Sequence, residues 1–294
     1  MKIKTLAAAL LMLAATSAPA AERPGIMIEG VQMPAWVEHA SGVRDPLAIG
    51  MALTNKDRIY TGPSSRAWLR LADGSLIKLG ENGILALDDL GQKKIQMKDV
   101  VTASLDVLSG AFRFTTQALY KFRGERDVKI RIVTITTGLR GTDVWAKADK
   151  TRDMVCLIQG VITVAHEQEA FTMDQPMSFY IAPKNGPPLP VAPVSQQQFD
   201  QWALETEIAS GAGAVRKGGK WRVYVAEANN QDDALGAYDQ LRNAGYAAEI
   251  RPVKSEAGTL YRVRISNLPS RQEAEVLAGK LKGNMGIVEP KISM

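Results

Sequence analysis

The sequence predicts a multidomain protein with an all-β N-terminal domain and an α+β C-terminal domain of ferredoxin-like βαββαβ order. Three observations predict it. Short alternating apolar segments, separated by Gly, Asp and Asn, fill residues 22–194. A glycine-rich stretch follows at residues 210–219. The segment after it, residues 220–294, contains a strand and helix pattern that occurs twice.

The bulk composition is that of a globular protein with room for two domains. The chain has 294 residues, of which 46% are hydrophobic and 23% are charged, so disorder is not expected. The formal net charge of +5 comes without a basic cluster, so a nucleic-acid partner is not expected.

Residues 1–20 have the features of a secretory signal peptide. Lys2 and Lys4 precede an apolar run at 6–15, and Ala-Pro-Ala at 18–20 is a small-residue cleavage site. We therefore expect a periplasmic chain that begins at Ala21. The apolar run is shorter than the roughly 20 residues of a membrane-spanning helix, and no transmembrane segment is expected in the mature chain.

The β domain is expected to cover residues 21–194. Apolar residues alternate with polar ones at 67–71, Asp73-Gly74 suits a two-residue turn, and 76–79 returns as the second strand of a hairpin. Further strands are predicted at 84–87, 101–108, 111–115, 128–136, 142–148, 155–158 and 161–165. Many short strands at this spacing favour a sandwich, barrel or solenoid.

The single cysteine, Cys156, lies in an apolar run at 154–158, which predicts a buried and unreactive thiol. No disulfide can form within the chain, so each domain must bury its own core.

A short helix and a linker are expected to join the domains. Ser195 and Gln198 form a capping-box pattern at the start of residues 195–209, where Phe199 and Trp202 share one helical face. This helix is expected to pack back on the β domain. Residues 210–219 contain four glycines and are expected to form a flexible linker.

The C-terminal segment repeats itself. Residues 221–242 align without gaps on 261–282, and each copy reads as a strand followed by a helix. Ser270 and Glu273 form a capping box at the second helix. Strands at 247–253 and 287–292 complete a four-stranded sheet with two helices on one side.

Strand alternation assigns the two faces of that sheet. Val223, Val225, Val263 and Ile265 should face the helices. The opposite face then carries Arg222, Tyr224, Arg262 and Arg264. A ring can lie against a sugar's C–H surface, and guanidinium groups can bind the lactyl carboxylates of muramic acid in two places. These four residues are the predicted glycan-binding residues; the alternative is that they are solvated residues without a ligand.

This segment resembles the SPOR domain (sporulation-related repeat) over residues 220–294. The resemblance rests on Trp-Arg-Val-Tyr-Val at 221–225, Tyr-Arg-Val-Arg-Ile at 261–265 and Ser-Arg-Gln-Glu-Ala at 270–274. It implies a βαββαβ fold that binds denuded septal peptidoglycan along the sheet face. The sequence departs from the family at Tyr224, where Gln is usual, at 226–228, where Gly-Ser-Phe is usual, and at 266–268, where Gly-Pro is common.

The β domain resembles the FecR-type periplasmic domain over residues 42–164. The resemblance rests on the segments 57–62, 71–75, 108–112 and 139–144. It implies a module that binds a protein or a glycan. Some relatives are transmembrane regulators that signal to a sigma factor, but we expect no direct transduction here because the membrane helix is not seen. Arg140 and Thr142 are expected to be turn and strand residues rather than contacts.

No catalytic or metal site is expected, and no cofactor. His39 and His166 lie 127 positions apart, without metal-ligand spacing. Asp88 and Asp89 are adjacent, so as strand residues they would point to opposite faces and could not flank one glycosidic bond; a turn is expected there.

The sequence thus predicts a non-catalytic periplasmic protein that binds peptidoglycan glycan strands, near division sites, with the β domain as an interaction module. One alternative is an envelope signalling accessory whose β domain binds a membrane receptor. Another is a cell-wall hydrolase with an unrecognised site.

Overall fold

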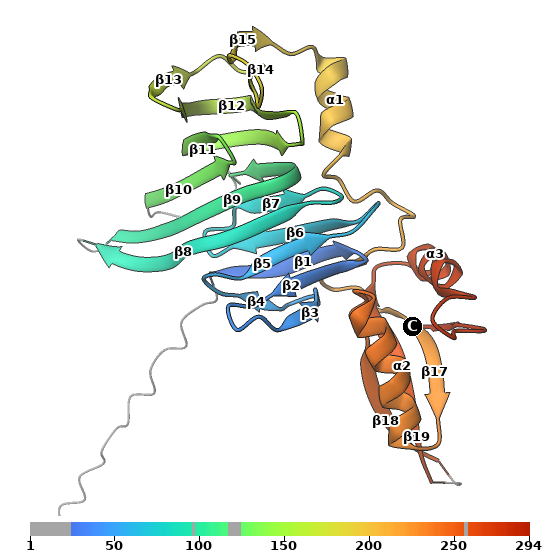
Figure 1. The fold of residues 1–294 in the computed structure, drawn as a ribbon. Coiled ribbons are helices and arrows are strands. Elements are labelled where there is room, and N and C mark those ends of the chain that lie inside the picture. The colour runs from blue at the N-terminus through green and yellow to red at the C-terminus, as the bar shows by residue number, and fades with distance from the viewer. Residues whose placement is uncertain (1–24, 96–97, 117–124, 256–257) are drawn as a thin grey trace, which may run out of the picture.

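The computed structural model describes residues 25–95, 98–116, 125–255 and 258–294 (Figure 1). The predicted signal peptide at 1–20 lies outside the described residues. The described part is mostly β, with a small C-terminal α/β region, which agrees with the predicted fold class at that level.

The N-terminal region consists of strands, which Figure 1 shows stacked one above another. They are β1 Ile26–Gln32, β2 Ala35–Glu38, β3 Arg44–Pro46, β4 Ala52–Leu53, β5 Arg58–Thr61, β6 Arg66–Leu71, β7 Leu76–Leu79, β8 Ile84–Ile95, β9 Lys98–Thr115, β10 Glu125–Ile132, β11 Ile135–Ala148, β12 Arg152–His166, β13 Glu169–Met173, β14 Ser178–Pro183 and β15 Leu189–Pro193. With a later strand, β16 Val215–Arg216, they form one hydrogen-bonded sheet of 16 strands.

Two long strands each pair with different neighbours along their length. The first half of β11 pairs with β10 and its second half with β9. Likewise, β12 pairs with β14 through its first half and with β13 through its second. The main core includes the fully buried Leu85, Phe112, Ile130 and Val144, which come from β8, β9, β10 and β11.

The separate short strands predicted at 101–108 and 111–115 are one strand, β9, and those at 155–158 and 161–165 are one strand, β12. Gly110 and Gly160 lie within these strands with φ of 84° and 98°. Because glycine adopts positive φ without strain, it can accommodate a local irregularity without ending the strand. The predicted hairpin is present as β6 and β7, but its connection covers four residues, 72–75.

The helix after the β region, α1 Gln196–Leu204, begins at Ser195, whose side chain accepts a hydrogen bond from the Gln198 backbone N–H. Phe199 is buried, and the Trp202 ring stacks on Trp145 with centroids 5.0 Å apart. Cys156 is fully buried in the same cluster. The predicted packing of this helix on the β region and the predicted burial of the thiol are both confirmed.

The C-terminal module has the predicted element order. It contains β17 Trp221–Ala228, α2 Gln231–Asn243, β18 Glu249–Ser255, β19 Gly258–Leu268, α3 Arg271–Leu281 and β20 Lys291–Ser293. The strand order is β18-β19-β17-β20, and all neighbours are antiparallel. The last strand is shorter than predicted, and Ile287 is buried before it begins.

The glycine-rich stretch at 210–219 is not the flexible linker that the sequence predicts. Its Val215 pairs with Val31 of β1. The Glu273 carboxylate accepts hydrogen bonds from the backbone N–H groups of Gly211, Gly213 and Ala214, at 2.6, 2.5 and 3.0 Å. Gly211 and Gly213 have φ of 78° and 72°, a conformation that lets successive N–H groups converge on one anion.

A second set of contacts joins the α2 end of the C-terminal module to the β region. The Ala35 backbone N–H donates to the Gly245 carbonyl at 3.1 Å. Arg242 forms an ion pair with Asp45, with 2.7 Å between Nη2 and Oδ1. A Cβ atom on Gly245 would lie 2.5 Å from the Trp36 ring, so only glycine allows this approach.

Candidate functional site

The four predicted glycan-binding residues lie on two adjacent central strands of the C-terminal sheet. Arg222 and Tyr224 belong to β17, and Arg262 and Arg264 belong to β19. Tyr224 and Arg264 are register partners. Their strand neighbours Val223, Val225, Val263 and Ile265 are buried in the core shared with α2 and α3. Alternation therefore places the four residues on the side away from the helices, which we call the open face.

The open face also carries two carboxylates that the sequence reasoning missed. The pairing of β17 with β19 shifts between Tyr224 and Ala226, so that Glu227 pairs with Arg262. Glu227 then lies on the same face as the arginines, although strict alternation would turn it toward the helices. Glu249 of β18 is the register partner of Arg264 and reaches the same face.

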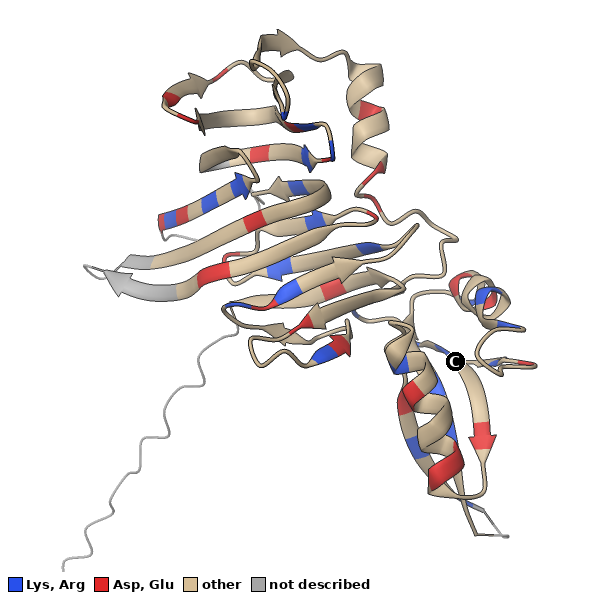
Figure 2. Ribbon diagram, viewed as in Figure 1, with Lys and Arg blue, Asp and Glu red and all other residues tan. Residues whose placement is uncertain are grey.

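These carboxylates form ion pairs with the arginines of the open face. Glu227 lies 3.0 Å from Arg262 Nε and 3.1 Å from Lys291 Nζ. Glu249 lies 2.9 Å from Arg264 Nε and also pairs with Arg251 at 2.8 Å. Both signs of charge are visible along the strands of the module in Figure 2. The arginines are thus held in position, and an incoming carboxylate would compete with Glu227 and Glu249 for them.

The electrostatics of the face follow from these contacts. A hydrogen bond from Lys291 holds the pKa of Glu227 below its usual value, with Arg262 acting in the same direction. Burial alone would raise the pKa of Glu249, but hydrogen bonds from Ser266 and Arg264 lower it on balance. The pKa of Tyr224 is lowered by its hydrogen bonds with Ser293 and Arg264. Both carboxylates are therefore ionised at neutral pH.

The Tyr224 ring lies beside two arginines of the open face, Arg262 and Arg264. Its centroid is 5.7 Å from the Arg262 guanidinium carbon, within cation–π range. Because the Tyr224 side chain forms hydrogen bonds with Ser293 and Arg264, it offers a positioned aromatic surface beside guanidinium donors. An aromatic face next to planar cationic donors suits a polymer that has both C–H surfaces and carboxylates.

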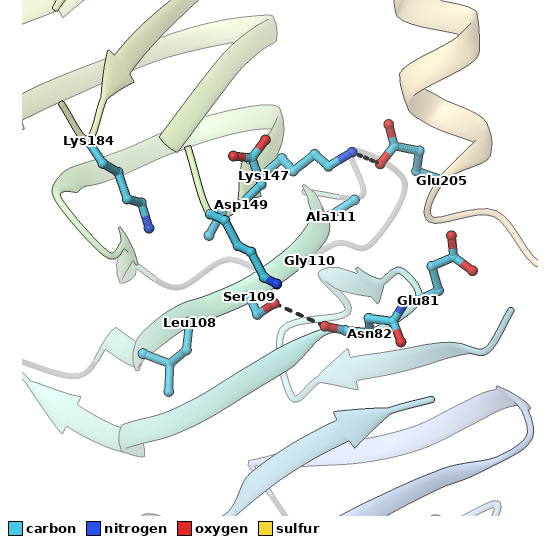
Figure 3. Close-up of a pocket in the computed structure, with 12 residues that line it drawn as sticks. Glu81, Asn82, Leu108, Ser109, Gly110, Ala111, Lys147, Asp149, Lys184 and Glu205 are labelled. Carbon is cyan, nitrogen blue, oxygen red and sulfur yellow. Dashed lines mark hydrogen bonds and ion pairs between the residues drawn. The ribbon is translucent and has the colours of Figure 1, made fainter. Parts of the chain in front are cut away.

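The β region has a hollow of its own, of about 470 Å³, at the bend of β9 (Figure 3). Lys147 and Lys184 line it, together with Asn82, Ser109 and Glu205. Lys147 Nζ lies 2.7 Å from Glu205, and the Ser109 hydroxyl donates to the Asn82 carbonyl at 3.1 Å. Lys184 pairs with the buried Asp153 at 3.4 Å. The lining therefore mixes both charges with polar groups.

The residues considered for catalysis each have separate partners and do not form a common site. His39 Nδ1 is 3.0 Å from Asp57, and His166 packs edge-on against Tyr180. Asp88 and Asp89 do not form a turn as expected: they lie within β8 at an irregularity, where Asp89 has φ of 48°. Within the described ranges, no group of three or more His, Cys, Asp or Glu residues is arranged to hold a metal.

The structure places Thr142 in β11, with its side chain 2% exposed. Its Oγ1 atom has no hydrogen-bond partner. The backbone of Arg140 pairs with Val161 in the same sheet; its side chain lies outside the described atoms. A position within β11 agrees with the expectation that these are structural residues of a strand.

Two protein families match the chain. The FecR protein family matches residues 57–163, and the SPOR domain family matches residues 217–291. No curated protein matches the chain. In the part of the chain that the structure describes, every helix is too short or too polar to cross a bilayer.

Two solved structures overlap with the chain at low similarity. Both are crystal structures of a "putative anti-sigma factor" from Parabacteroides distasonis ATCC 8503. The 2.50 Å structure is 14% identical with a TM-score of 0.38, covering 74% of this chain and 87% of that chain. The 1.65 Å structure is 15% identical with a TM-score of 0.39, covering 71% and 99%. Overlap at this level carries no argument about function.

The order of the two family matches agrees with the resemblances seen in the sequence, and both families are typical of the cell envelope. The chain therefore contains a FecR region followed by a C-terminal SPOR domain.

Proposed function

We propose that this chain is a non-catalytic periplasmic protein that binds denuded peptidoglycan strands through the open face of its SPOR domain. The observation that carries the proposal is the arrangement of Arg262 and Arg264 around the Tyr224 ring, on the sheet face that the helices leave uncovered. Sugar rings would lie against Tyr224, and the lactyl carboxylates of muramic acid would bind the two guanidinium groups.

The paired carboxylates make this binding selective for strands without stem peptides. In the free protein Glu227 and Glu249 partly neutralise Arg262 and Arg264. A ligand must therefore supply carboxylates of its own to replace these pairs, and a neutral amide offers no such replacement. Muramic acid offers a free carboxylate only where the peptide has been removed.

The FecR region supplies an interaction module. The long strands of its sheet change partners along their length. We infer from this that the FecR region is a solenoid-like β domain. The hollow beside Lys147 and Lys184 has mixed charge, which suits a polar segment of an envelope protein or a glycan. The second candidate function is that of an envelope signalling accessory. In that case a membrane receptor would bind at this hollow.

The test is co-sedimentation of the full chain with peptidoglycan sacculi before and after amidase treatment. We expect amidase treatment to increase the bound fraction, and Arg262→Ala or Arg264→Ala to weaken binding by roughly 10- to 100-fold, the effect of losing one charged hydrogen-bonded contact. The matched control is Arg271→Ala, because Arg271 lies on α3 in an exposed pair with Glu275. Equal binding by all four proteins, with and without amidase, would overturn the proposal.

A further inference from the structure

A second, smaller hollow lies where the SPOR domain meets the FecR region. It encloses about 220 Å³. One wall comes from the FecR region, through Ala48 and Ile49 in the connection from β3 to β4. The other wall comes from Ala247 and Ala248, which precede β18. None of these residues belongs to the predicted glycan-binding set.

The hollow is continuous with the open face. Glu249 and Ser266 line it, and the Ser266 hydroxyl donates to Glu249 Oε1 at 2.6 Å. The same carboxylate oxygen lies 2.9 Å from Arg264 Nε. A polymer bound along the arginines would therefore reach the hollow at the Glu249 end of the sheet.

The docking of the two domains maintains this hollow. Val215, which also lines it, pairs with β1 and belongs to the segment held by Glu273. On the other side, the Gly245 carbonyl accepts from the Ala35 N–H at 3.1 Å. The walls are thus fixed from both domains, and the small side chains of Ala48, Ala247 and Ala248 leave space between them.

The chemistry of the lining is apolar at the walls and polar at the rim. Alanine, isoleucine and valine side chains suit a methyl group, while Glu249 can accept an N–H and the Asn267 side chain can donate to a carbonyl. An acetamido group has a methyl, an N–H and a carbonyl on one small planar unit. A hydroxyl alone would leave the apolar walls without a partner.

We propose that this hollow binds one N-acetylated sugar of the glycan strand, with its acetamido group against the Ala48 and Ala248 walls, so that the FecR region forms part of the glycan site. The inference rests on the proposed function. On this proposal, the junction between the two domains selects the acyl group of the sugar, which the open face alone does not contact.

The experiment uses the full chain and amidase-treated glycan strands that are chemically de-N-acetylated and then re-acylated with either acetyl or butyryl groups. We expect the unaltered protein to prefer N-acetyl strands by about tenfold, because the larger acyl chain does not fit. Ala248→Leu should fill the hollow and weaken binding of N-acetyl strands by about tenfold. Ala170→Leu, at an exposed position on β13, is the matched control and should bind as the unaltered protein does.

A second variant guards against misfolding of the first. Ile49→Ala enlarges the hollow and should raise the affinity for N-butyryl strands relative to N-acetyl strands, a gain that misfolding cannot produce. The inference is overturned if the unaltered protein binds both strands equally, or if Ala248→Leu and Ile49→Ala leave the acyl preference unchanged. Arg262→Ala should weaken binding to both strand types. If the unaltered protein bound neither strand type, that result would instead refute the proposed function.

Discussion

The Glu273 carboxylate should be the main determinant of how firmly the two domains are joined. It is 6% exposed and accepts three backbone N–H groups from residues 211–214. A hydrogen bond to a charged group contributes about 1.5–3 kcal/mol, and the contributions of neighbouring bonds are not additive. We therefore expect Glu273→Ala to lower the free energy of unfolding by about 4 kcal/mol, and the isosteric Glu273→Gln, which keeps one acceptor, by about half of that.

Two controls separate this role from simple helix capping. Ser270→Ala removes only the N-cap of α3 and should cost about 1 kcal/mol. Glu275→Ala removes an exposed pair with Arg271 and should cost less than about 0.5 kcal/mol. If Glu273 acted only on the helix terminus, its loss would also cost about 1 kcal/mol or less.

The assay is urea unfolding followed by circular dichroism and tryptophan fluorescence, with limited proteolysis of residues 210–219 in the native protein. Glu273→Ala should make this segment cleavable and separate unfolding into two transitions. A single transition within 0.5 kcal/mol of the Glu275→Ala value, with no new cleavage, would refute the reasoning.

Two further predictions concern titratable groups. Burial raises the pKa of the Cys156 thiol to about 12, so iodoacetamide at pH 8 should not modify the native protein and should modify one thiol in urea; modification of the native protein would contradict its burial. The pKa values of Glu227 and Glu249 are lowered in the folded state, so their stabilisation is present above the usual carboxyl pKa of about 4.5 and is lost as pH falls from there through the lowered values. Urea unfolding between pH 6 and pH 3 should therefore show a smaller acid-induced loss in Glu227→Gln/Glu249→Gln than in the unaltered protein, and identical pH profiles would contradict this.

Strand alternation was enough to predict the faces of β17 and β19 at Val223 and Val263, because side chains of regular strands alternate between the two faces of the sheet. Strict alternation does not hold after Tyr224, where the pairing with β19 shifts and Glu227 comes to the open face. A bulge depends on the partner strand and cannot be read from one strand alone. One signal was available, however: an acid at a position expected to face the helices is itself an indication of a register change.

The glycine-rich segment shows a different limit. Four glycines at 210–219 are equally compatible with a flexible linker and with a backbone that needs positive φ. What decides between them is the Glu273 carboxylate, 60 positions away from Gly213. The sequence assigned Glu273 to a capping box; Ser270 does cap the helix, but the glutamate carboxylate binds the linker backbone. Local patterns predict local partners, and this partner is not local.

The order of the linker changes how the proposed binding should be understood. A SPOR domain on a free tether would localise the FecR region to the cell wall without orienting it. Here two separate sets of contacts, at Glu273 and at Gly245, join the domains. A glycan strand on the open face would therefore fix the orientation of the FecR region, including the hollow beside Lys147, relative to the wall. Orientation reduces the entropy that a later partner must lose on binding, so glycan binding would favour a partner contact at a distance from the glycan itself.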